Sequence, residues 1–172
     1  MMAMKRFGAC GLVLLLCASG ARGAAPEAVL ADAAERMDRA AVRALLQQRA
    51  DVNAPQVDGM TALHWAAYRD DLETGALLVR AGADVKAANR YGVTPLSMAC
   101  VNGNGEMIEL LLKAGADPNT ALPGGETALM TAARTGKPEV IKALIAYGAD
   151  PNAKESVQNP FGGRNSVLVI SQ

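Results

Sequence analysis

A single spacing of 33 residues recurs along this chain and restricts its fold more than any other feature. Three threonines share it: Thr61, Thr94 and Thr127. Three glycines repeat in the same register: Gly82, Gly115 and Gly148. An Ala-Asp pair recurs four times, with its aspartate at Asp51, Asp84, Asp117 and Asp150. A fixed period of this length indicates an array of small units in which each unit packs only against its neighbours.

Each unit has the pattern of two short helices separated by turns. In the third unit, Gly92 supplies a turn, Thr94 is placed to cap a first helix, and Pro95 stands at its first position, where a missing N–H is harmless. Gly103 ends that helix, and Gly115 follows the apolar second helix, where a positive φ is favoured. Alanine supplies much of the 51% apolar content and aromatic residues only 3%, which favours closely packed helices over strands. We therefore expect an all-α fold.

The segments DGMTALHWAA, YGVTPLSMAC and GGETALMTAA, each followed by LL..AGAD or a close variant, resemble ankyrin repeats. The resemblance covers Val29 to Lys154 and is nearest to small exported bacterial ankyrin-repeat proteins. It implies a solenoid of about four helix-turn-helix units with β-turn or hairpin fingers, following a signal peptide. We place the array at residues 24–154, with repeats at approximately 24–55, 56–88, 89–121 and 122–154.

The first two units depart from the family pattern. Residues 29–57 lack the threonine box, and their charged run ERMDRAAVR suits an exposed first helix, so we interpret them as the N-terminal cap. The second unit has Gly75 where the later units have Ile108 and Ile141. Glycine inside a helix costs about 1 kcal/mol relative to alanine. Because the glycine also buries less apolar area, we expect the second repeat to be the weakest internal unit.

The repeat pattern stops after Lys154. A fifth unit would place threonine at position 160, where the chain has Pro160. Residues 155–172 are therefore expected to form a non-repeat or truncated tail. Its apolar run Val167–Ile170 either folds back over the last repeat or belongs to the stump of a longer array. Of these two interpretations we favour the stump. An uncapped end of the array would also permit self-association.

Residues 1–23 have the layout of a secretory signal peptide. Lys5 and Arg6 precede the uncharged apolar run Phe7–Ala18, and small residues around Gly23 favour cleavage after that glycine. An uncleaved anchor is the alternative, although about a dozen apolar residues are short for a bilayer. We expect a periplasmic or secreted bacterial protein without a stable membrane span after cleavage.

Loss of this segment changes the cysteine count and the charge. Cys100 becomes the sole cysteine, so it cannot form an intrachain disulfide. Because the export signal predicts an oxidising compartment, Cys100 must be buried or it risks forming a disulfide between chains. The full chain has 17 basic and 17 acidic residues, and the three basic residues of the segment leave with it. The remaining chain is mildly acidic, which gives no indication of nucleic-acid binding.

His64 is the only histidine and precedes the only tryptophan, so it is the first candidate for chemistry. One histidine excludes a His-pair metal site, and one cysteine cannot build a zinc cluster. A nucleophile–base pair with Cys100 is disfavoured, since Cys100 takes an alanine-pair position that packs inward. His64 matches the histidine of the Thr-Pro-Leu-His box, which in ankyrin repeats donates hydrogen bonds between neighbouring repeats. We expect a buried scaffold imidazole, with no catalytic residue, metal or cofactor.

Two further motifs have structural interpretations. The segment ARTGK partly resembles a phosphate loop, but Thr131 and Pro138 stand where such a loop needs glycine and a Mg²⁺-binding hydroxyl. The aspartates that recur once per repeat are expected to accept hydrogen bonds from the backbone of the next turn, rather than to bind calcium.

Recognition of another protein is the remaining expectation. The resemblance implies that a partner lies on the fingers and on the concave face of the first helices. We select these variable positions: Gln56, Val57, Asp58, Trp65, Tyr68, Arg69, Asn89, Arg90, Tyr91, Val101, Asn102 and Arg134. A wider set adds Met60, Val93, Met98, Leu122, Pro123, Gly124, Glu126 and Thr135. Trp, Tyr and Arg most often dominate binding energy, although Trp65 and Tyr68 could instead pack against the neighbouring finger.

These patterns favour a non-catalytic protein–protein interaction module that binds through its finger turns and concave helix face. The alternative is an accessory or inhibitory subunit of a periplasmic or secreted enzyme.

Overall fold

The computed structural model describes residues 28–122 and 124–154, so the segments 1–23 and 155–172 discussed above lie outside the described residues. The described part contains eight α-helices, which are α1 Val29–Glu35, α2 Arg39–Gln47, α3 Ala62–Tyr68, α4 Leu72–Arg80, α5 Pro95–Asn102, α6 Gly105–Lys113, α7 Ala128–Thr135 and α8 Pro138–Ala146. Within the same residues the only β-type pairing is an isolated bridge between Ala121 and Thr127.

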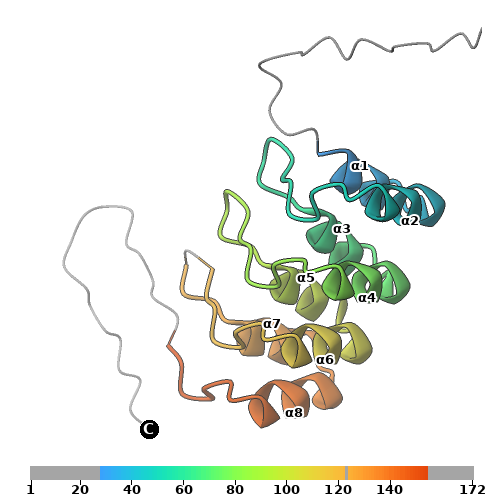
Figure 1. Ribbon diagram of the computed structural model, residues 1–172. Helices are drawn as coiled ribbons and strands as arrows, with labels where there is room; N and C mark the ends of the chain where they lie inside the picture. The colour runs from blue at the N-terminus through green and yellow to red at the C-terminus, as the bar shows by residue number, and fades with distance from the viewer. Residues whose placement is uncertain (1–27, 123, 155–172) are drawn as a thin grey trace, which may run out of the picture.

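The helices form four antiparallel pairs that stack in chain order, with α1 and α2 at one end and α7 and α8 at the other (Figure 1). The inner helices α1, α3, α5 and α7 pack against one another in succession, and the outer helices α2, α4, α6 and α8 do the same. The loops between pairs project to one side of the stack as fingers (Figure 1). The expected all-α solenoid of helix-turn-helix units is confirmed.

The predicted signals for the ends of the helices are confirmed in the third unit. The side-chain oxygen of Thr94 accepts a hydrogen bond from the backbone N–H of Ser97, 3.3 Å away, and Pro95 opens α5. Gly103 ends α5 in the left-handed region with φ +66°, where glycine has no steric penalty. Pro138 opens α8 in the same way that Pro95 opens α5.

Small residues at the alanine-pair positions let the inner helices approach closely. Ala67, Ala99, Cys100 and Ala132 have no exposed surface. The predicted burial of Cys100 is therefore confirmed, and burial raises the pKa of its thiol to about 12. A thiol with such a pKa is almost entirely protonated at neutral pH.

The prediction that the charged run ERMDRAAVR forms the first helix of the cap is wrong. That helix, α1, is VLADAAE. Its residues Leu30, Ala31, Ala33 and Ala34 are buried, and the helix packs against α3 and α2. The charged run begins at the end of α1 and continues into α2. The 33-residue register explains the difference, because α1 lies one period before α3 and therefore takes the same inner position.

Ion pairs hold this cap on the next unit. Arg39 of α2 lies 2.9 Å from Asp71 and 3.3 Å from Glu73, and Arg43 also pairs with Glu73. Asp71 is only 3% exposed and caps α4 by accepting from the N–H and hydroxyl of Thr74. Burial would raise the pKa of Asp71, but the hydrogen bonds from Arg39 and Thr74 outweigh it and hold that pKa below its usual value.

The recurring aspartates shape the turn that follows each outer helix, as predicted. Asp51 accepts a hydrogen bond from the N–H of Asn53 at 2.9 Å, and the other three aspartates do the same for the residue two positions on. Asn53 in turn bridges to the next unit, because its side chain accepts from the N–H of Asp84 and donates to the carbonyl of Gly82. At the corresponding position of the second unit the chain has Lys86, whose ammonium group cannot accept a hydrogen bond.

The fingers are β-turns that contact one another through backbone. In the first, the N–H of Gly59 donates to the carbonyl of Gln56, and in the second that of Gly92 donates to Asn89. The N–H of Arg90 then donates to the carbonyl of Asp58, which joins these two fingers. A Cβ atom on Gly59 would lie 3.0 Å from the backbone of Asn89, so the close approach of the two fingers requires glycine.

Gly75 in α4 is matched by a large neighbour. An added Cβ atom would lie 3.0 Å from the Cε and 3.1 Å from the Sδ of Met107 in α6. Met107 is itself fully buried. The thioether therefore occupies the space beside Gly75, and the next unit supplies apolar packing where the glycine has no side chain of its own.

Candidate protein-binding surface

The inner helices carry a column of side chains that repeats in the 33-residue register, one from each unit. It consists of Glu35, Tyr68, Val101 and Arg134. Tyr68 is 53% exposed and Val101 is 64% exposed, and Arg134 is exposed as well. Because consecutive inner helices pack side by side, the column contributes one position from each of the four helices α1, α3, α5 and α7. From the first unit to the fourth, the residue in this column is acidic, then aromatic, then aliphatic and finally basic.

Trp65, Tyr68 and Arg69 form an aromatic cluster at the end of α3, and we call it the α3 cluster. The rings of Trp65 and Tyr68 meet edge to face with centroids 5.8 Å apart. The Arg69 guanidinium carbon lies 5.8 Å from the centre of the Trp65 ring and 5.6 Å from that of Tyr68, within the range of cation–π attraction. Residues three and four apart on a helix share one side, which explains the grouping. Among the described residues, Arg69 forms no ion pair.

Gln56 in the first finger fixes the orientation of this cluster. The indole N–H of Trp65 donates to its side-chain oxygen at 2.7 Å. The amide nitrogen of Gln56 donates to Asp32 at 2.7 Å and to Glu35 at 3.0 Å, both in α1. The tryptophan is therefore half-buried and held by its own finger, not by the neighbouring one, while Tyr68 stays exposed.

In the fingers, the exposed side chains differ from those that shape the turns. Val57 is 83% exposed and Tyr91 is 69% exposed, and Arg90 is exposed beside it. The side-chain oxygen of Asn89 instead accepts from the backbone N–H groups of Tyr91 and Val93, and Asp58 accepts from that of Met60. The side chains of Asn89 and Asp58 thus stabilise the turns, and the residues next to them expose their side chains to solvent.

A shallow groove continues the surface from the third unit to the fourth. It has a volume of about 150 Å³ and is lined chiefly by Val93, Met98, Val101, Leu122, Glu126 and Arg134. Glu126 and Arg134 form an ion pair at its rim. Asn102, next to Val101, donates to the carbonyls of Ala67 and Tyr68 at 3.0 and 2.9 Å and so joins α5 to the end of α3.

The predicted binding residues therefore divide into two groups. Exposed side chains are contributed by Val57, Tyr68, Arg69, Arg90, Tyr91, Val101 and Arg134. Hydrogen bonds within the scaffold engage Gln56, Asp58, Trp65, Asn89 and Asn102. Met60, from the wider set, is only 5% exposed and packs inside the finger, because the turn directs its side chain toward the core. The repeat register locates these positions, but it does not reveal which polar side chains bind the scaffold.

His64 has the buried scaffold position that was predicted. Its Nε2 lies 3.0 Å from the carbonyl oxygen of Val93 in the next finger, so Nε2 must carry the proton. Its Nδ1 accepts from the backbone N–H of Thr61 at 3.2 Å. Burial lowers the pKa of this imidazole despite the bond to Val93, so it is neutral at physiological pH. Both ring nitrogens are engaged, and neither is available to Cys100.

A family model described as "Ankyrin repeats (3 copies)" matches residues 1–89, 30–122 and 77–155, and these ranges together span most of the chain. The chain belongs to the ankyrin-repeat family. Ankyrin repeats are protein–protein interaction modules, and they are typically non-catalytic. No curated protein matches this chain. The surface formed by the fingers and inner helices of this ankyrin array is therefore its candidate binding site.

Two observations complete the description of the array. None of the helices between residues 28 and 154 is long and apolar enough to cross a membrane. Residues 28–122 and 124–154 bring together no group of three or more His, Cys, Asp or Glu side chains with the geometry of a metal site.

Proposed function

We propose that this ankyrin array is a non-catalytic module that binds a protein partner through its fingers and inner-helix column. The observation that carries the proposal is the α3 cluster, in which Tyr68 is exposed and the Arg69 guanidinium stacks on two rings without a carboxylate partner among the described residues. Aromatic and arginine side chains held in a fixed geometry supply large contact area at low entropic cost.

The partner segment is expected to combine carboxylates with apolar side chains. Arg69 and Arg90 are exposed cations that form no ion pair with a described residue. Val101 and the adjoining groove offer an apolar contact on the third and fourth units. A carboxylate that meets Arg69 would gain a charge-assisted hydrogen bond, which is stronger than a neutral one.

We further propose that the module acts in the periplasm or outside the cell. The support is the layout of residues 1–23, with Lys5 and Arg6 before an apolar run and small residues near Gly23. Intact-mass measurement of the protein from a bacterial expression host should give a chain that starts at residue 24 in the exported fraction. An intact leader on cytoplasmic protein would contradict this part of the proposal.

The binding role can be tested with a matched pair of tyrosine variants. Tyr68→Ala with Arg69→Ala removes the exposed part of the α3 cluster, whereas Tyr147→Ala removes a tyrosine of similar exposure, 41%, at the end of the outer helix α8. Wild type and both variants, immobilised, would be exposed to periplasmic and secreted proteins, and each captured protein would then be titrated in purified form.

We expect the cluster variant to bind the partner at least about tenfold more weakly than wild type, since truncation of interface aromatic and arginine residues commonly costs more than 1 kcal/mol each. Tyr147→Ala should bind like wild type. Thermal unfolding of all three proteins provides the control for folding. If the cluster variant is folded and every captured partner keeps its affinity, the proposed surface is wrong.

A further inference from the structure

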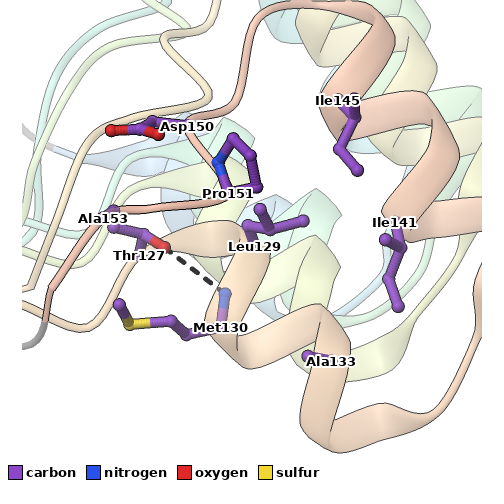
Figure 2. A pocket seen from close by; sticks show the side chains of 9 residues that line it. All are labelled: Thr127, Leu129, Met130, Ala133, Ile141, Ile145, Asp150, Pro151 and Ala153. Carbon is purple, nitrogen blue, oxygen red and sulfur yellow. Dashed lines mark hydrogen bonds between the residues drawn. The ribbon is translucent and has the colours of Figure 1, made fainter. Parts of the chain in front are cut away.

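The last unit of the array leaves an apolar hollow at its outer end. The hollow has a volume of about 270 Å³ and lies between α7, α8 and the turn that follows α8. Figure 2 shows the side chains of Leu129, Ile141 and Ile145 and the ring of Pro151 around it. Ile145 is 48% exposed, whereas Leu112, one period earlier, is 4% exposed.

Earlier units show how the same positions behave when they are covered. One period before Leu129, Leu96 is 1% exposed, and one period before Ile141, Ile108 is fully buried. Leu129 and Ile141 are only partly buried. In each earlier unit the following helix pair lies over these positions, since α5 packs on α7 and α6 packs on α8. The hollow is therefore lined by residues whose counterparts in the earlier units are covered by another element.

We propose that the run Val167–Ile170 of the same chain covers this hollow and caps the array. The run contains only Val, Leu, Val and Ile and carries no charge. Four adjacent apolar side chains match a hollow lined by leucine, isoleucines and proline. This assigns the tail to the first of the two interpretations given above, a segment that folds back over the last repeat.

The path of the chain supports this occupant. Pro151 and Ala153 line the hollow, so the chain passes along its edge immediately before Lys154. Twelve residues separate Lys154 from Val167. Fully extended, they reach about 40 Å, which is more than the width of a helix pair. A tethered segment also acts at an effective concentration in the millimolar range, which favours it over a second copy of the chain.

The proposal can be tested by charge placed inside and beside the run. Val167→Asp with Val169→Asp spoils the apolar segment, whereas Ser166→Asp with Ser171→Asp adds the same charge on its two sides. Ile145→Asp places a charge in the lining of the hollow and leaves the tail unchanged. All variants would be purified from cells that express the full-length chain, and hydrogen exchange would be followed in α7 and α8, with α3 as the internal reference.

We expect amide exchange in α7 and α8 to accelerate on the order of tenfold in Val167→Asp with Val169→Asp and in Ile145→Asp, because each variant weakens apolar packing. Exchange in α3 and in the serine variant should match wild type. Equal exchange in wild type and the valine variant would overturn the proposal. Protection of α7 and α8 that disappears on dilution, together with a dimer in light scattering, would assign the hollow to a second copy and overturn it equally.

A cross-linking measurement provides a test that does not depend on destabilisation. Cysteines introduced at Ile145 and Val169 should form an intrachain disulfide under mild oxidation, detected by mass spectrometry. A pair at Arg80 and Val169 is the control, since Arg80 lies in α4, two units away from α8. Failure of the first pair to form, or equal yields from both pairs, would contradict a tail that rests in the hollow.

Discussion

His64 connects two repeats through a neutral ring. Its Nε2–H donates to the carbonyl of Val93 in the next finger, and its Nδ1 accepts from the N–H that precedes its own helix. A second proton would have to sit on Nδ1, where it would face the N–H of Thr61. Burial lowers the pKa of His64, although the hydrogen bond to Val93 favours the charged ring, and the contact between the two repeats is therefore sensitive to acid.

This sensitivity predicts a loss of stability in mild acid. Because the pKa of folded His64 lies below its unfolded value of about 6.5, the unfolded chain binds the proton more readily. The free energy of unfolding should be independent of His64 above pH 6.5 and should fall below it, by at most about 1.4 kcal/mol per pH unit. Urea unfolding of wild type and His64→Gln between pH 5 and 8 measures this dependence.

His64→Gln should be less stable than wild type at pH 7.5 and should lose most of the pH dependence between 5 and 6.5. Asp71 does not interfere there. Its folded pKa is below the unfolded value, so its contribution disappears only as the pH falls below about 3.9. A slope between pH 5 and 6.5 that persists unchanged in the variant would show that another group causes it.

Among the elements, the polar bridges between consecutive turns differ from one repeat to the next. Asn53 joins the first turn to the second, and Asn119 joins the third to the fourth by accepting from Asp150 N–H at 2.8 Å and donating to the carbonyl of Gly148 at 2.9 Å. Lys86 holds the intervening position and is exposed. The bridge is therefore interrupted between the second and third turns.

Lys86→Asn should restore this bridge and stabilise the array. The new side chain would reach the carbonyl of Gly115 and the N–H of Asp117, which correspond to the partners of Asn53 and Asn119. Two solvent-exposed hydrogen bonds should add about 0.5–1.5 kcal/mol to the free energy of unfolding. The reverse change, Asn119→Lys, should lower it by a similar amount. A Lys86→Asn protein no more stable than wild type in urea would contradict the argument.

Gly75 provides a second prediction for an element. Replacing it by isoleucine, the residue of the later repeats, should destabilise the protein by about 1–3 kcal/mol, because Met107 already fills the space. Met107→Ala alone should cost about 2–5 kcal/mol through the cavity it leaves. The double variant should cost clearly less than the sum of the two, since the isoleucine enters that cavity. Additive losses in chemical denaturation would show that the two positions are independent.

The helices and their order could be predicted from the sequence, while several interactions between side chains could not. Threonine, proline and glycine act on their own backbone, so Thr94, Pro95 and Gly103 mark the ends of α5 without knowledge of the rest of the fold. Gln56 and Asn102 form bonds across units, which depend on how neighbouring units stack. The same is true of Met107, whose role beside Gly75 becomes visible only in three dimensions. The charged run at 35–43 is placed wrongly from sequence because the cap lacks the threonine that marks the register.

Across the part of the molecule that the structure describes, consecutive units pack on one another, and the two ends of the array differ in the side chains that they bury and expose. The N-terminal pair packs its apolar helix α1 against α3, and Arg39 and Arg43 add ion pairs to Asp71 and Glu73 of the next unit. The C-terminal pair exposes apolar side chains around the hollow beside Ile145. Stability of such an array is approximately a sum of units and interfaces. Opening should therefore begin at the ends and reach the middle last.

The order in which the units open can be measured through the rate at which the thiol of Cys100 is labelled. It lies in α5 in the third unit, has no exposed surface, and has a pKa of about 12 in the folded chain against about 8.5 when exposed. In a chain that starts at residue 24, a thiol reagent at pH 8 should label it only in molecules whose centre has opened, and Lys86→Asn should slow the labelling. Val57→Cys combined with Cys100→Ala should be labelled at the full rate of an exposed thiol, since Val57 is 83% exposed. The labelling rate of Cys100 thus reports how often the interior of the array opens. Rapid labelling of the folded wild type would show that this rate does not depend on opening.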